Sequence, residues 1–289
     1  WGFIAASNGV FIPFCKEYFN LSQFQSQLID TAFYGAYYFG ALFLFLFSSN
    51  TKKDLINKWG YKTSIIYGLM ISALGALFML SAIKTGSFNL ILISLFIIAI
   101  GFCLQQTAAN PFVISLGDEK SGSHRLNLAG GVNSLGTTVG PIILSVILFG
   151  SISDTSINIQ NINILYILVA ILFLFAALFL QVSKNLPNIR KISNVTASPK
   201  ANKLLINLTF CILLFSVLSL IDYIENHLIL STIFLLIFLF LIIFIILIPL
   251  FKKRKSLKDW GAMKYPQLNL GMLAIFAYVG VEVTIQSNL

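Results

Sequence analysis

The 289-residue chain carries a formal charge of +9, but only 10 % of its residues are charged and 57 % are hydrophobic. A mean hydropathy of +0.89 excludes an ordinary soluble domain. The basic residues lie almost entirely in short connections between apolar runs, so the charge indicates membrane topology and not a nucleic-acid partner. We therefore predict an all-α, multi-pass membrane protein.

The chain starts at Trp1 rather than Met and stops at Leu289 within an apolar segment, so we interpret it as a fragment of a longer protein. Its three cysteines, Cys15, Cys103 and Cys211, are far apart and show no disulfide or metal-ligand spacing. We expect no metal site and treat the cysteines as small core residues.

The first three predicted spans lie between residues 1 and 83. Residues 1–15 form the remaining part of a first span, interrupted at Asn8-Gly9 and closed by Pro13. The second span, 22–48, contains Asp30, and a basic loop, 49–62, follows it. The third span, 63–83, is rich in small residues, which predicts close helix packing.

Spans four and five, at about 90–115 and 126–150, carry most of the polar side chains at membrane depth. We expect span four to break near Asn110-Pro111, before a charged loop from Asp118 to Arg125. Uncharged amides in a membrane need partners or a wet cavity, and Gly136 and Gly140 would allow two helices to approach closely. The simpler interpretation is that these residues hold the helices together and line no cavity.

The rest of the chain adds a sixth span and an unusual insertion. Span six (164–182) is apolar all round, as expected for a peripheral helix facing lipid. The predicted organisation is a bundle over 1–183, a linker (184–203), an inserted helical hairpin (204–251), a basic loop (252–266) and a further span (267–289). Of the 19 Lys and Arg, only Lys16 and Lys84 lie on the side opposite to the basic loops, so we place those loops in the cytoplasm.

Two carboxylates lie inside predicted spans, Asp30 and Glu282. A charged group at membrane depth is unfavourable, which makes both candidates for cation coupling; the alternative is a protonated or amide-bonded structural role. Tyr34 and Tyr37 share a helix face with Asp30, and Tyr34 suits either a sugar ring or simple packing. Neutral amides match neutral polyols; the candidates are Gln105, Gln106, Asn110, Asn133 and Asn8.

Several blocks follow one another in spans four and five: 106–112 (QTAANPF), Leu116-Gly117, 125–129 (RLNLA) and Asn133-Ser134 with Gly136. In order and spacing they resemble the fucose–galactose–glucose:cation symporter family of the major facilitator superfamily. The resemblance runs from Trp1 to about Lys184 and resumes at Tyr265-Pro266. The loop 57–62 is similar to the superfamily's Asp-Arg-x-Gly-Arg-Lys, with Asn57 in the Asp place, so a helix-capping role is not carried over to it.

The resemblance implies a major-facilitator six-helix bundle, plus a two-helix insertion and the start of a second bundle. It implies hexose transport by alternating access in a bacterial inner membrane, with H⁺ or Na⁺ as the co-transported cation, no other cofactor and a monomeric protein. In this family the positions of Gln106 and Asn133 contribute to the sugar site. The fucose-transporting branch has acids at the places of Gly9 and Gln106, so the glucose/galactose branch fits better.

Two other function classes remain open at this point. One is a carrier of a different neutral solute, such as a nucleoside. The other is a membrane enzyme acting on lipid-linked sugars, which would need a carboxylate cluster or basic groups in a loop. The sequence has only two histidines, His124 and His227, and no nucleophile or phosphate-loop motif, so we expect no enzymatic activity.

Overall fold

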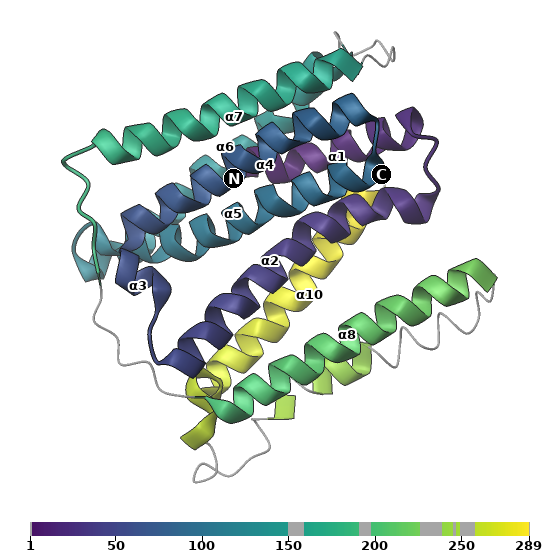
Figure 1. Cartoon of the computed structure of the whole chain (residues 1–289). Helices are drawn as coiled ribbons and strands as arrows, with labels where there is room; N and C mark the ends of the chain where they lie inside the picture. Colours follow the sequence, from purple (N-terminus) through teal and green to yellow (C-terminus); the bar gives the residue numbers. More distant parts are fainter. Residues whose placement is uncertain are drawn as a thin grey trace. The chain divides into compact units, whose positions relative to one another are not determined.

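The computed structural model describes residues 2–149, 159–190, 198–225, 239–244, 247–248 and 258–288, and its elements in this part are helices (Figure 1). The longer elements are α1 (Gly2–Tyr18), α2 (Gln23–Thr51), α4 (Tyr61–Thr85), α5 (Phe88–Ser115), α6 (Gly122–Phe149), α7 (Ile159–Val182), α8 (Pro199–Glu225) and α10 (Pro266–Asn288). The short ones are α3 (Leu55–Trp59), η1 (Glu119–Ser121) and η4 (Lys258–Lys264).

The chain divides into two compact units. The first comprises residues 1–44, 54–193 and 286–289, and the second comprises 45–53 and 194–285. Six helices of the described part are long and apolar enough to cross a membrane: α2, α4, α5, α6, α7 and α8. The prediction of an all-α, multi-pass membrane protein is confirmed.

The core of the first unit is built on a close seam between α4 and α5. A Cβ atom added at Gly101 would collide with the Gly68 carbonyl oxygen and with the Ser72 hydroxyl oxygen. Only glycine therefore fits at this crossing, because any side chain would push the two backbones apart. The small residues of the third predicted span do pack closely, as expected.

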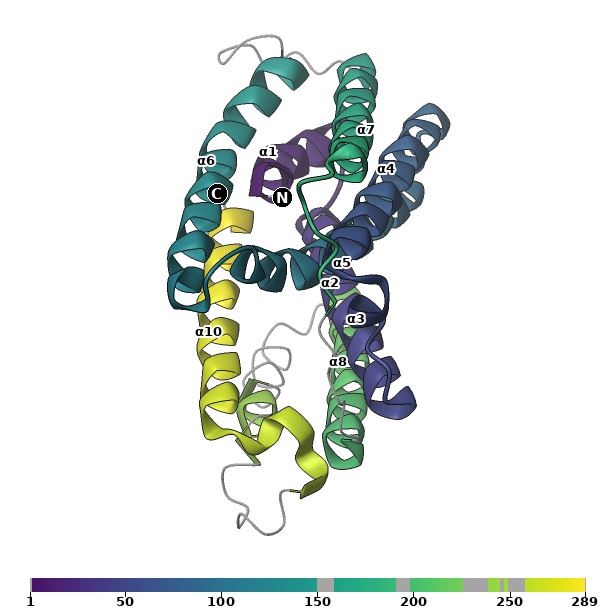
Figure 2. The ribbon, with the colours of Figure 1, turned by 90° about the vertical axis from the view of Figure 1, so that its left-hand side faces the viewer.

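A second close seam joins α1 to α6. A Cβ atom at Gly140 would lie 2.6 Å from the carbonyl oxygen of Phe3, and one at Gly136 would lie 3.2 Å from the Phe3 nitrogen. These two glycines, one helical turn apart, allow a close approach of two helices as the sequence predicted, and the structure identifies the partner as α1. Figure 2 shows α1 lying between α6 and α7.

Two expected helix ends are wrong. Helix α5 continues through Pro111 to Ser115, and α1 continues through Pro13 to Tyr18. Proline removes one backbone donor and crowds the preceding turn, but membrane helices tolerate it when other groups satisfy the freed carbonyls. In α5 only about one turn follows Pro111, so the proline stands close to the end of the helix.

The corner between α3 and α4 is fastened to the segment that follows α7. Lys62 donates from its Nζ atom to the carbonyl oxygens of Ser183 (2.7 Å) and Leu186 (3.2 Å). Asn188 donates from Nδ2 to the Trp59 carbonyl oxygen (3.0 Å) and to the Thr63 hydroxyl (2.8 Å). The first part of the predicted linker is thus fixed on the first unit.

The cap of α3 comes from a residue that the sequence analysis did not single out. Asp54 accepts hydrogen bonds from the backbone nitrogens of Ile56 (2.9 Å) and Asn57 (3.3 Å), and from the Asn57 side chain (2.9 Å). Asp is a favoured N-cap because its carboxylate satisfies free donors of the first turn. The acid that caps this helix lies three positions before Asn57.

In the second unit, α8 begins at Pro199, slightly ahead of the predicted apolar run at 204. Proline at the first helical position is favoured because its missing N–H is not needed there. Ser198 donates its backbone N–H to the Ser49 hydroxyl (3.0 Å), and the Asn202 side chain donates to the Asn50 side-chain oxygen (2.9 Å). Most of the second apolar run of the predicted hairpin lies outside the described residues.

Candidate solute and cation site

The intramembrane carboxylate Asp30, on α2, is paired with an amide on α1. Asn8 donates from Nδ2 to Asp30 Oδ1 at 3.3 Å, and the two residues are only 4 % and 8 % exposed. A buried carboxylate needs such a donor because it has lost its water. Two of the residues predicted for the site, one for the solute and one for the cation, are therefore brought together.

Tyr34 and Tyr37 lie on α2 beside the core residue Phe33. The Phe33 ring centroid is 5.5 Å from that of Tyr34, edge-on, and 5.7 Å from that of Tyr37. Phe33 continues this contact to Phe102 of α5 at 5.9 Å. Packing thus accounts for one side of each tyrosine, and both remain half-buried.

The adjacent amides Gln105 and Gln106 of α5 have different surroundings. Gln105 donates from Nε2 to the Ser72 hydroxyl of α4 (3.0 Å), which in turn donates to the Ile98 carbonyl oxygen (3.0 Å). Gln106 is half-buried, and its side chain makes no hydrogen bond within the described part of the chain. Gln105 is thus held in the α4–α5 seam, whereas the amide of Gln106 is available to a ligand.

The remaining predicted amides lie on α5 and α6. Asn133 of α6 accepts the backbone N–H of Gly2 on its Oδ1 atom at 2.8 Å, across the α1–α6 seam. It is half-buried, whereas Asn110 of α5 is exposed. Glu282 belongs to α10, but its side chain lies outside the part of the structure that can be described.

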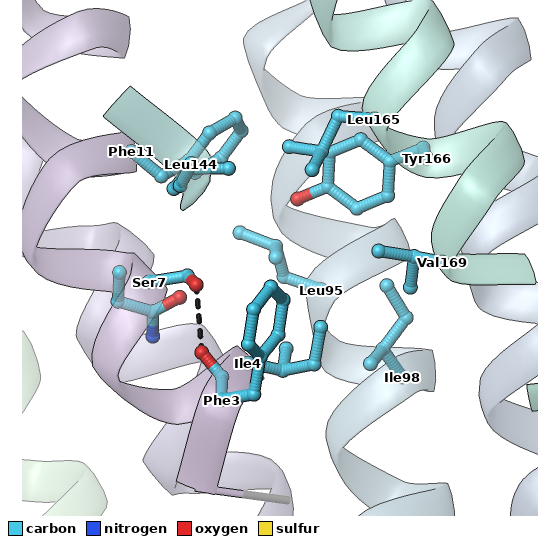
Figure 3. A pocket seen from close by; sticks show the side chains of 11 residues that line it. Phe3, Ile4, Ser7, Phe11, Leu95, Ile98, Leu144, Leu165, Tyr166 and Val169 are labelled. Carbon is cyan, nitrogen blue, oxygen red and sulfur yellow. Dashed lines mark hydrogen bonds between the residues drawn. The ribbon is translucent and has the colours of Figure 1, made fainter. Parts of the chain in front are cut away.

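A small cavity lies inside the first unit (Figure 3). One of its lining residues is Asn8, which is bonded to Asp30. Its space for water-sized molecules is about 30 Å³, far below the roughly 300 Å³ or more of a typical small-molecule site. Asn8 lines it together with Ser7 and Tyr166, and the other lining residues are Phe3, Ile4, Phe11, Leu95, Ile98, Leu144, Leu165 and Val169. It is too small to hold a hexose.

Arg125 holds the loop between α5 and α6, a role that the sequence did not indicate. Its guanidinium donates to the carbonyl oxygens of Val113 (3.0 Å), Ile114 (2.5 Å) and Asp118 (2.9 Å), and to the Ser121 hydroxyl (2.7 Å). The fork of five donors suits several carbonyls at the end of a helix. Arg125 therefore caps the C-terminal end of α5.

Among the described residues, no three His, Cys, Asp or Glu side chains gather into a group that could hold a metal ion. What the site offers is an array of neutral hydrogen-bonding groups on α1, α5 and α6, with one intramembrane carboxylate on α2. Such an arrangement can bind neutral hydroxylated solutes and can change its protonation or ligation at a single position.

Comparisons with known proteins place this chain in a family. The chain is 28 % identical over 291 residues to the glucose/galactose transporter of Brucella abortus biovar 1 (strain 9-941), covering 100 % of this chain and 54 % of that protein. It is 35 % identical over 156 residues to the L-fucose-proton symporter of Escherichia coli (strain K12), covering 54 % and 34 % of the two chains. The chain thus spans about half the length of the first of these relatives, and no solved structure matches it. Residues 2–284 match the family described as the Major Facilitator Superfamily, and the chain belongs to this family of membrane transporters.

Proposed function

We propose that the full-length protein carries out secondary active transport of a hexose across a bacterial inner membrane by cation symport. The observation that carries this proposal is the state of Gln106, a half-buried intramembrane amide without a hydrogen bond inside the described residues. An amide at membrane depth that is not used by the protein is suited to a hydroxylated, uncharged ligand. The similarity to a glucose/galactose transporter and to an L-fucose-proton symporter supports a hexose.

The solute-binding residues that we propose are Gln106 and Asn133, and Asn110, Asn8 and Tyr34 are further candidates. Gln105 is assigned a supporting role, because its amide is already bonded to Ser72 across the α4–α5 seam. Asn133 keeps its side-chain nitrogen for a ligand while its oxygen accepts from Gly2. A hexose offers both donors and acceptors to such amides, and its C–H faces suit an aromatic neighbour.

Cation coupling is assigned to Asp30, with Glu282 as a second candidate. Coupling by symport needs a group whose charge or ligation changes during the transport cycle. Asp30 has the required chemistry, and its hydrogen bond to Asn8 connects α2 with α1. Protonation of Asp30 or binding of Na⁺ would alter this bond, so the state of the cation would affect how the two helices are joined.

The mechanism that we propose is alternating access, in which the bundle described here rocks against a second bundle around a midplane site. The close seams support movement as a body, since Gly68 and Gly101 on one side and Gly140 on the other leave no room for sliding helices. We propose that the protein acts as a monomer, and that its co-transported ion is H⁺ or Na⁺.

A carrier of another neutral solute, such as a nucleoside, is the second candidate, because an unpaired amide also suits a nucleobase edge. An enzyme acting on lipid-linked sugars is less favoured, since no metal-binding group of carboxylates is found in the described part of the chain.

The test is uptake of radiolabelled glucose, galactose and fucose by the full-length protein in cells without their own hexose carriers. Uptake is measured with and without a sodium gradient, at two external pH values, and with unlabelled nucleosides as competitors. Hexose accumulation that depends on one of the two gradients supports the proposal. Absent hexose uptake with gradient-driven nucleoside uptake would assign the protein to the second candidate.

A further inference from the structure

The small cavity lined by α1, α5, α6 and α7 receives the hydroxyl group of Tyr166, which has no partner among the described residues. Tyr166 of α7 is 7 % exposed, and its ring meets Phe11 edge-on with centroids 5.9 Å apart. Figure 3 shows its hydroxyl oxygen directed into the cavity. Within the described residues this hydroxyl makes no hydrogen bond, and a hydroxyl that faces a mainly apolar cavity without a partner is unfavourable.

The cavity is large enough for water. It provides about 30 Å³ for water-sized molecules, whereas one water needs about 10–15 Å³ measured in this way. Volume alone does not decide hydration, because a cavity lined only by apolar groups stays dry. Polar groups in the lining are therefore the deciding feature.

Three polar side chains line this cavity and could share a water molecule. Tyr166 contributes its free hydroxyl from α7, and Ser7 and Asn8 contribute from α1. The Ser7 hydroxyl donates to the Phe3 carbonyl oxygen (2.6 Å), which leaves its own lone pairs as acceptors (Figure 3). Asn8 uses one N–H on Asp30 and retains a second N–H and its oxygen. A buried water typically makes about three hydrogen bonds, and this lining offers that number.

We propose that the cavity is a hydration site. An ordered water molecule there accepts a hydrogen bond from the Tyr166 hydroxyl and forms a further hydrogen bond with Ser7 or Asn8. A metal cation is not favoured there, because no carboxylate lines the cavity and eight of its eleven lining residues are apolar. Such a lining could not replace the oxygen shell that a cation requires. Water needs only the two to four polar partners that are present.

This water extends the polar contact of Asp30 to a third helix. Asp30 on α2 is bonded to Asn8 on α1, and the water would continue this chain to Tyr166 on α7. The site does not depend on the identity of the transported solute, so it can be tested apart from the transport function.

The test is radiolytic labelling of the full-length protein in lipid nanodiscs, in H₂¹⁸O, with mass spectrometry of the peptides. Hydroxyl radicals formed from a buried water modify the side chains beside it. We expect Tyr166 to be modified several-fold faster than Phe33 and Phe102, which are fully buried and do not line the cavity. Modification of Tyr166 as slow as that of these two rings would overturn the proposal.

Two variants make the test sharper. Val169→Ile adds one methylene group to the lining, and we expect it to slow the labelling of Tyr166 while Phe33 and Phe102 are unchanged. In Tyr166→Phe, loss of a water-bonded hydroxyl should lower the melting temperature of the purified protein. A higher melting temperature in Tyr166→Phe would show that the hydroxyl had no water partner in the cavity, and it would contradict the hydration site.

Discussion

The Nζ atom of Lys62, at the start of α4, lies 2.7 Å from the carbonyl oxygen of Ser183, directly after α7. The same atom also donates to the Leu186 carbonyl oxygen at 3.2 Å. A lysine at the C-terminal end of a helix satisfies free carbonyls and interacts favourably with the helix dipole. The Lys62 side chain thereby connects the start of α4 to the segment that follows α7.

Lys62→Met should loosen this tie. Hydrogen bonds to a charged group contribute about 1.5–3 kcal/mol, so the variant should lower the melting temperature and expose the segment around Leu186 to protease. Lys58→Met is the matched control, because Lys58 is exposed and its ammonium group bonds to no described residue. Equal protease sensitivity in the two variants would show that the tie contributes nothing.

Gly60 is required at the same corner for two reasons. Its φ angle is +89°, and a Cβ atom there would collide with the side-chain oxygen of Asn188. Gly86 also has a positive φ, +62°, but no described atom lies within 4 Å of its added Cβ. Gly86→Ala should therefore cost about 1 kcal/mol from backbone strain alone, and Gly60→Ala should cost more. Thermal melts of the two variants that shift equally would contradict the collision with Asn188.

The α4–α5 seam should not tolerate a methyl group. Gly101→Ala would place its Cβ against Gly68 and Ser72, so we expect a loss of about 1–3 kcal/mol, or poor expression. Gly130→Ala on α6 is the control, since nothing described lies near its added Cβ and alanine favours helix. The amount of folded protein, measured by size-exclusion chromatography in detergent, should fall for Gly101→Ala only.

Gln105 and Gln106 should respond differently to alanine. Gln106→Ala and Asn133→Ala should each weaken hexose binding several-fold, as expected for the loss of one neutral hydrogen bond of about 0.5–1.5 kcal/mol. Gln105→Ala should instead lower stability with little effect on affinity, because its amide is bonded to Ser72. Binding is measured by isothermal titration calorimetry on full-length protein, with melting temperatures beside it. Unchanged affinity in Gln106→Ala at normal stability would show that this amide does not contact the solute.

Hydropathy alone placed the helices well because a membrane span needs a long apolar run, and such runs are visible without any alignment. The two glycine seams were also predictable, since Gly136 and Gly140 are one turn apart and small residues gather in α4. The expected break at Pro111 was wrong. Proline usually interrupts a helix that continues well beyond it, but Pro111 stands only about one turn from the end of α5.

The contacts made by polar side chains were harder to predict. The partner of Asn8 is Asp30, and the partners of Lys62 lie more than a hundred positions away in sequence. Such pairings depend on how helices rotate about their axes, and an all-round apolar pattern does not fix that rotation. The difference in hydrogen bonding between Gln105 and Gln106 has the same origin, because neighbouring residues in a helix point in different directions.

Coupling of solute movement to a cation gradient through Asp30 is tested most directly by concentrative uptake and solute exchange, measured side by side. Both are recorded for the full-length wild-type protein and for Asp30→Asn, which keeps a side chain of similar shape next to Asn8. We predict that Asp30→Asn loses uphill accumulation of the hexose but retains exchange of labelled for unlabelled hexose, and the retained exchange shows that the protein is folded. Uphill accumulation at the wild-type level in Asp30→Asn, and also in the Asp30→Asn, Glu282→Gln double variant, would contradict the assignment.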